Sequence, residues 1–207
     1  MKSIVLPGTT IETVLAPGAA DRQLTPLFSC GGLVLSQVCQ LTGLEGYTIQ
    51  NWIKRKFLPP PVKKKYSRYQ LCRLFNINLL KDTFTLEQAV TLLGYISGSF
   101  NDMADNDTAD IETADNDSTD SDSSDDLISD SRLYAYLVDC LATLNQPDHL
   151  DLSRTGETVR EVTADYKSPH RDAEIRLRLV LEIMLTACQA QQVSRRALDM
   201  FRRLDDM

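Results

Sequence analysis

The sequence predicts a mainly helical, all-α protein, in which a winged helix-turn-helix domain is joined to a C-terminal helical segment by a disordered acidic linker. Three observations lead to this prediction. Apolar residues recur at helical spacing on both sides of residue 100. A glycine turn and three consecutive prolines interrupt the first set of helices. Between the two sets, residues 98–127 are mainly Asp, Asn, Ser, Thr and Ala.

Residues 1–30 form the first predicted unit, which we expect to be a loop-rich arm. Proline and glycine occur throughout it, and neither helical nor strand periodicity extends over a useful length. A short helix near residues 20–23 is compatible with the pattern.

The helix-turn-helix is predicted over about residues 35–56, within a domain of residues 31–97. An apolar stripe marks the first helix, formed by Val34, Val38 and Leu41. This helix ends at Gly43, because glycine tolerates the positive φ of a tight turn. The second helix has one apolar face, formed by Ile49, Trp52 and Ile53. Its other face is polar and available to nucleic acid, and it carries Gln50, Asn51, Lys54 and Arg55.

A basic wing is predicted directly after the second helix. The prolines at 59–61 end that helix, because proline has no amide donor and clashes with the preceding turn. The next residues are a basic run with interleaved aromatics, short enough for a hairpin tip: Lys63, Lys64, Lys65, Tyr66, Ser67, Arg68 and Tyr69. From Leu33 to Lys81 there are nine Lys or Arg and one acid, in a chain whose net charge is −7. A local excess of positive charge favours phosphate binding.

Two further helices complete this domain. The first runs from about Arg68 to Leu80 with Ser67 as its cap. The second extends to about Ile96 and opens with a capping box, in which Thr85 is followed three residues later by Gln88.

The acidic linker dominates the charge of the whole chain. Twelve of the 29 acids lie between Asp102 and Asp130, where there is no Lys or Arg, which leaves 17 acids against 22 bases elsewhere. Low hydrophobicity and unbalanced charge predict disorder. Calcium binding by its spaced aspartates is disfavoured, because the glycine and the closing glutamate of an EF-hand loop are missing.

Residues 128–207 are predicted to be helical. The first helix is capped by Ser129 or Ser131 and has an apolar stripe of Leu133, Leu137, Cys140, Leu141 and Leu144. A polar segment follows, with a short strand near Thr158–Val162. A third segment opens at Ser168-Pro169 and continues as a helix to about Gln191. Its broad apolar side comprises Ile175, Leu179, Val180, Leu181, Ile183, Met184, Leu185 and Cys188. A separate final helix, capped by Ser194, covers Arg195–Leu204.

The breadth of that apolar side has two explanations. Either the helix is buried within one protomer, or part of it is the seam of a homodimer. We expect intramolecular packing to cover the larger share and a dimer interface to lie somewhere in the C-terminal half.

The order of features in residues 41–69 resembles the DNA-binding domain of MerR-type regulators, through Leu41–Leu44, Thr48-Ile49, Trp52, Phe57–Pro59 and Arg68-Tyr69. The chain is also similar to a bacterial family, domain-of-unknown-function family 1836, whose members are presumed regulators. That resemblance rests on Gly31–Cys39, Gln50–Arg55, Lys65–Ser67 and Ile77-Asn78, and covers about Leu27 to Leu137 without the linker. MerR-type proteins usually have arginine at the position of Gln50 and glycine at that of Lys56.

The expected function is therefore a sequence-specific transcriptional regulator that binds double-stranded DNA. Residues on the early turns of the second helix would reach base edges in the major groove: Tyr47, Thr48, Gln50 and Asn51. The phosphate contacts would come from Lys54, Arg55, Lys63, Lys64 and Lys65, with Tyr66 and Arg68 beside them. A solvated basic surface is the alternative interpretation of these residues. The rival function is a protein-interaction adaptor built on the same scaffold.

Enzymatic motifs are missing from the sequence. It contains no glycine-rich phosphate loop, no nucleophile elbow and no His-Glu pair at ligand spacing, so neither an enzyme nor a cofactor is expected. His149 and His170 have no neighbouring metal ligands. The five cysteines lack a C-x-x-C pair, which favours free thiols over the alternative of a Cys140–Cys188 redox switch. Without a signal peptide or an apolar run of about 20 residues, we expect a cytoplasmic protein.

Overall fold

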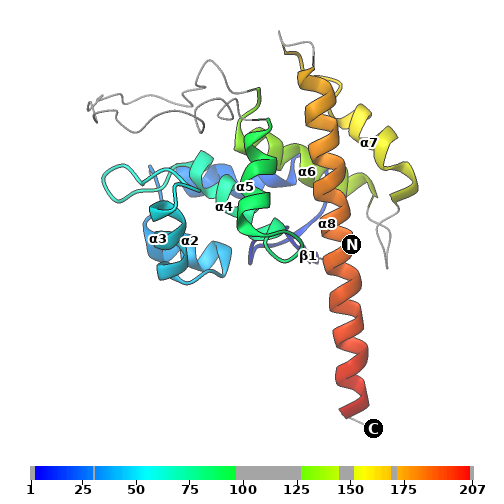
Figure 1. Ribbon diagram of the computed structural model, residues 1–207, viewed down its shortest axis with the longest axis horizontal. Coiled ribbons are helices and arrows are strands. Elements are labelled where there is room, and N and C mark those ends of the chain that lie inside the picture. Colours follow the sequence, from blue (N-terminus) through cyan, green and yellow to red (C-terminus); the bar gives the residue numbers. More distant parts are fainter. Residues whose placement is uncertain (1–2, 30, 97–126, 145–151, 169–171, 206–207) are drawn as a thin grey trace.

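The computed structural model describes residues 3–29, 31–96, 127–144, 152–168 and 172–205. These residues are mainly helical, which confirms the predicted fold class (Figure 1). The elements in chain order are β1 (Ser3–Val5), β2 (Glu12–Val14), α1 (Ala19–Leu24), the 3₁₀ helix η1 (Thr25–Phe28), α2 (Leu35–Thr42), α3 (Gly46–Lys54), α4 (Arg68–Leu80), α5 (Leu86–Gly94), α6 (Asp130–Leu144), the 3₁₀ helix η2 (Leu152–Arg154), α7 (Thr155–Val162) and α8 (Ala173–Asp205).

The N-terminal arm contains more regular structure than its sequence suggests. β1 and β2 form an antiparallel hairpin with Ile4 opposite Thr13, and the short helix expected near residues 20–23 is α1. The hairpin loop docks on α4, where a Cβ at Gly8 would lie 2.1 Å from the Phe75 carbonyl oxygen. Only glycine fits this contact, so Gly8 is required by close approach as well as by its φ of 68°.

α4 is the central helix of the fold. It contacts α2, α5, α6 and α8, and ten of its thirteen residues are buried. Its N-terminus has the predicted cap, since Ser67 Oγ accepts from the Gln70 amide at 3.3 Å. The capping box of α5 is also confirmed, with Gln88 N donating to Thr85 Oγ1 at 3.2 Å. Because α4 contacts helices that precede the linker and helices that follow it, the two sets of helices share one continuous core.

α6 joins that core through the stripe predicted for it, and all five residues of the stripe are buried. The ring of Tyr134 lies 5.3 Å from that of Phe75 on α4, and the Tyr134 hydroxyl donates to the Pro7 carbonyl at 2.8 Å. Ser129 provides the cap, because its Oγ accepts from the Arg132 amide at 3.3 Å. One tyrosine thus connects α6 to both α4 and the N-terminal arm.

Two C-terminal predictions are wrong. The segment predicted as a strand near Thr158–Val162 belongs to helix α7, because Thr158, Val159 and half-buried Val162 lie at helical spacing on the side that meets α6 and α8. The separate final helix does not exist either, since α8 is continuous from Ala173 to Asp205. Ser194 lies inside it without ending it, because neither glycine nor proline follows and the next residues are strong helix formers.

The apolar side of α8 is divided between the core and the solvent. The half that faces α4, α6 and α7 is buried and includes Leu177, Val180, Leu181, Met184 and Cys188. Ile175 and Leu179, which the sequence pattern places on the same side, are 65% and 49% exposed. The predictions of linker disorder at 98–126, of a helix end at Pro147 and of surface positions for His149 and His170 lie outside the described residues.

Candidate nucleic-acid interface

α3 is oriented as its apolar spacing predicts. Ile49 and Trp52 are buried against the core, and Ile53 packs partly against it. The turn before α3 is fixed by Gly43, whose φ is 69°, and by the Thr42 hydroxyl, which donates to the Val38 carbonyl and accepts from the Leu44 amide. The predicted base-contacting side chains therefore face outward: Tyr47, Gln50 and Asn51 are exposed and Thr48 is half-buried.

The predicted wing is a hairpin with a two-residue tip. The Lys65 amide donates to the Val62 carbonyl at 2.9 Å, and Lys63 and Lys64 have φ values of 48° and 62°, as in a type I′ turn. At the base, Leu33 and Tyr66 exchange backbone hydrogen bonds of 2.9 and 2.7 Å. The hairpin presents Lys63, Lys64 and Lys65 to solvent.

The base of the wing requires a glycine. A Cβ at Gly32 would lie 2.8 Å from the Tyr66 carbonyl oxygen, so a larger residue would push the wing away from the chain that enters α2. Tyr66 is only 3% exposed, and burial raises the pKa of its hydroxyl. Its side chain is thus part of the support of the wing and lies away from the surface proposed to meet DNA.

Three lysines hold a left-handed backbone. Among the described residues, the only non-glycine residues with positive φ are Lys56, Lys63 and Lys64. Lys56 has a φ of 59° directly after α3, at the position where MerR-type proteins usually have glycine. The turn therefore keeps the backbone geometry that favours glycine, at a cost of about 1–2 kcal/mol for a residue with a side chain.

The arginines of this region are engaged within the protein. Arg55 pairs with Glu87 on α5 and lies 4.5 Å over the Phe57 ring. Arg68 pairs with Asp21 on α1. These two predicted phosphate contacts link α3 and α4 to neighbouring helices. By contrast, the ion pairs of the described residues include no lysine.

The exposed parts of the site share one end of the molecule. Figure 1 shows α3 and the loop that carries residues 62–65 on the same side, away from α7 and α8. Apart from the ion-paired Arg55, seven of the eleven predicted residues are exposed, and Thr48 is half-buried beside them: Tyr47, Gln50, Asn51, Lys54, Lys63, Lys64 and Lys65. The other three, Arg55, Tyr66 and Arg68, connect secondary-structure elements.

Two supporting residues carry no clear signal in the sequence. The buried Gln70 amide donates to the Pro59 and Pro60 carbonyls at 3.0 and 2.9 Å. Buried Arg73 donates through Nε to the Phe57 carbonyl at 2.9 Å. Together they fix the segment between α3 and the wing. The only hint of either residue is a polar side chain within an apolar helix, which by itself does not identify a partner.

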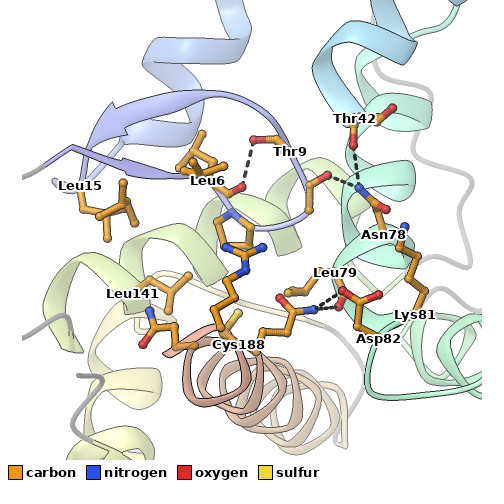
Figure 2. A pocket seen from close by; sticks show the side chains of 17 residues that line it. Leu6, Thr9, Leu15, Thr42, Asn78, Leu79, Lys81, Asp82, Leu141 and Cys188 are labelled. Carbon is orange, nitrogen blue, oxygen red and sulfur yellow. Dashed lines mark hydrogen bonds between the residues drawn. The ribbon is translucent and has the colours of Figure 1, made fainter. Parts of the chain in front are cut away.

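A cavity of ≈ 260 Å³ lies elsewhere, between the β1–β2 hairpin, the end of α4 and α8. Figure 2 shows polar Asn78, Lys81 and Asp82 along one side and Leu6, Leu15 and Leu141 along the other. None of the predicted site residues lines it.

Within the described residues, no cluster of three or more His, Cys, Asp or Glu is placed to hold a metal ion, and no helix is long and apolar enough to span a membrane. The described cysteines are free thiols, including Cys140 and Cys188.

Comparison with known proteins finds a family model that matches part of the chain. The family model described as domain of unknown function (DUF1836) matches residues 32–116. This range includes α2, α3, the wing, α4 and α5, so the match falls on the segment that carries the candidate interface. No curated protein and no solved structure matches the chain.

Proposed function

We propose that this protein is a sequence-specific DNA-binding transcriptional regulator. In this proposal α3 enters the major groove and the wing contacts the phosphate backbone, an arrangement that resembles MerR-type regulators. The supporting geometry is an outward polar face on α3 beside a hairpin tip of three exposed lysines.

One observation carries the proposal. Residues 33–81 contain nine cations, and the ion pairs of the described residues take three of them, Arg55, Arg68 and Arg73, but no lysine. Five lysines beside α3 therefore remain exposed: Lys54, Lys56, Lys63, Lys64 and Lys65. Because the arginines pair within the domain, the lysines are the cations of this region that remain available to neutralise phosphates.

Base recognition is assigned to α3. Gln50 and Asn51 lie on its exposed face, and their side-chain amides can each both donate and accept, which suits the N6 and N7 edge of adenine. Tyr47 and Thr48, in the first turn, would lie nearest the floor of the groove. Lys54, one turn further on, would reach the adjacent phosphates.

The test is binding of the full-length protein to a random-sequence duplex over a range of salt concentrations. When a protein neutralises phosphates with lysine, the logarithm of its DNA affinity falls linearly with the logarithm of the salt concentration. Lack of any affinity at low salt would overturn the proposal.

A protein-interaction adaptor is the second candidate. It is favoured by the exposure of Tyr47 and Val62, both 73%, because large apolar side chains on α3 and the wing also suit a protein partner. The same titration separates the two functions, since an adaptor would not bind the duplex. The homodimer expected from the C-terminal helices stays a prediction, and it depends on the exposed side of α8.

A further inference from the structure

The cavity beside the β1–β2 hairpin is large enough for a small organic molecule. Its volume is ≈ 260 Å³, and the hairpin, the end of α4, α6 and α8 all contribute to its walls. Figure 2 shows side chains from these elements converging on it. An apolar cavity of about 150 Å³ can hold benzene, so the larger volume here admits a molecule of about ten non-hydrogen atoms.

Hydrogen bonds between elements hold the walls in place. Asn78 Nδ2 on α4 donates to the Gly8 carbonyl of the hairpin at 2.8 Å and to the Thr42 carbonyl of α2 at 2.9 Å. Gln191 Nε2 on α8 donates to the Leu79 carbonyl at 2.6 Å. A ligand would therefore meet a site that is already formed, and its binding free energy would not be reduced by the ordering of loops.

The lining of the cavity is apolar in its depth and charged at its rim. The buried lining residues are mainly apolar and include Leu6, Leu79, Leu141 and Cys188, with half-buried Leu15 beside them. The exposed lining residues include three charged ones, Lys81, Asp82 and Arg195. This division suits a ligand with an apolar body and one charged group, because the body leaves water while the charge stays at the solvent edge.

The rim favours a negatively charged group. Neither Lys81 nor Arg195 takes part in the ion pairs found among the described residues. The carboxylate of Asp82, by contrast, accepts from Gln191 Nε2 at 3.4 Å. Gln191 lies one helical turn before Arg195, and Asp82 directly follows Lys81, so this contact brings the two cations to the same part of the rim. Two cations against one acid leave an excess of positive charge there.

We propose that this cavity binds a small organic carboxylate. Its apolar body would lie against Leu6, Leu15 and Leu141, and its carboxylate would accept charge-assisted hydrogen bonds from Lys81 and Arg195 at the rim. The hairpin, α6 and α8 all lie outside residues 32–116, so most of the site falls beyond the segment that the family model matches. The inference does not depend on DNA binding.

The first experiment titrates the full-length protein with octanoate, which has the required size and charge, and follows the backbone amides by NMR. Saturable shifts are expected at Leu6, Gly8 and Leu15 of the N-terminal arm and at Lys81 and Gln191. Octylammonium has the same chain with the opposite charge and should bind at least about tenfold more weakly. The proposal would be overturned by no saturable binding of octanoate up to about 10 mM. Equal affinities for the two probes, or shifts confined to residues 198–204 of α8, would also overturn it.

The second experiment removes the two cations of the rim. The double variant Lys81→Gln, Arg195→Gln should bind octanoate about tenfold more weakly than the wild-type chain. The matched control is Lys167→Gln, Arg196→Gln, which removes two exposed cations that do not line the cavity and should leave the affinity unchanged. Circular dichroism confirms that both variants are folded, as expected for substitutions at exposed positions. An unchanged affinity in the rim variant, or an equal loss in the two variants, would contradict the proposed site.

Discussion

Arg73 on α4 and Asp130 at the start of α6 form a buried ion pair across the linker, with Nη1 3.0 Å from Oδ2. Asn76 donates to the other oxygen of the same carboxylate at 3.0 Å, and Arg73 also donates to the Phe57 carbonyl just beyond α3. One guanidinium therefore connects the segment between α3 and the wing to the C-terminal helices. The position of the candidate interface is thus tied to Asp130, which lies 57 positions after Arg73 in the sequence.

The first prediction concerns this pair. Asp130→Ala should lower the free energy of unfolding by about 3–5 kcal/mol, because it leaves the Arg73 charge buried without a partner. Replacing both residues, as Arg73→Met with Asp130→Leu, should cost less. Asp199→Ala, which breaks the exposed pair with Arg202, should cost about 0.5 kcal/mol or less. Urea unfolding measures all three. Equal losses for Asp130→Ala and Asp199→Ala would show that the buried pair is not structurally important.

The second prediction concerns the wing. Replacing Lys63, Lys64 and Lys65 with alanine should reduce the salt dependence of DNA affinity by about 0.9 for each phosphate that is no longer neutralised. The control removes three exposed cations at the other side of the molecule, Arg154, Arg160 and Lys167, and should leave the slope unchanged. Fluorescence anisotropy over a salt series gives both slopes. If the two triple variants behave alike, net charge rather than the wing determines binding.

The third prediction separates neighbouring residues of α3. Asn51→Ala should relax sequence preference with little change in stability, because Asn51 is exposed. Trp52→Ala should lower the free energy of unfolding by about 3–5 kcal/mol, because it leaves a cavity in the core. Selection of bound duplexes from a random pool measures the first effect and urea unfolding the second. An unchanged stability of the Trp52 variant would mean that the faces of α3 are reversed.

The fourth prediction follows from the φ of Lys56. Lys56→Gly should raise the free energy of unfolding by about 1 kcal/mol, because glycine adopts a φ of 59° without the steric cost borne by a side chain. Lys54→Gly, two residues earlier and within α3, should instead lower it by about 1 kcal/mol. Thermal unfolding of the two variants gives the comparison, and a loss of stability in both would show that the left-handed turn does not form in solution.

The fifth prediction concerns thiol reactivity. Burial raises the pKa of Cys72, Cys140 and Cys188 to about 12, and it also raises that of half-buried Cys39. Since the thiolate is the reactive form, the three buried thiols stay protonated and inert well above pH 8. In a Cys30→Ser background, an aromatic disulfide reagent at pH 8 should react with at most one thiol, Cys39, until denaturant is added. Rapid reaction of two or more thiols in the folded protein would contradict this.

Local signals made much of the fold predictable. Gly43, Ser67 and Thr85 each mark a helix end through interactions within a few residues, and the structure confirms all three. The spacing of Ile49 and Trp52 predicts the orientation of α3 in the same way. The β1–β2 hairpin is not predictable, because three residues per strand are too few to show a period. The predicted division of α8 is wrong because Ser194 resembles a cap when its tertiary surroundings are unknown.

Distant partners limit the prediction of the site. Arg55, Arg68 and Arg73 carry the same positive charge as the wing lysines. In the folded chain, however, they form ion pairs with Glu87, Asp21 and Asp130, respectively. Sequence spacing does not reveal pairs separated by 32 to 57 residues. The sequence places Tyr66 at the surface because aromatic residues in a basic run often contact nucleic acid, whereas its backbone pairing with Leu33 turns the ring into the core.

Affinity of the full-length protein for a random-sequence duplex, measured by fluorescence anisotropy between about 50 and 200 mM salt, tests DNA binding most directly. The five exposed lysines predict measurable binding at the lower concentration and a log–log slope of about −4 to −5 with salt. No binding at the lower concentration, or an affinity independent of salt, would contradict the proposed function.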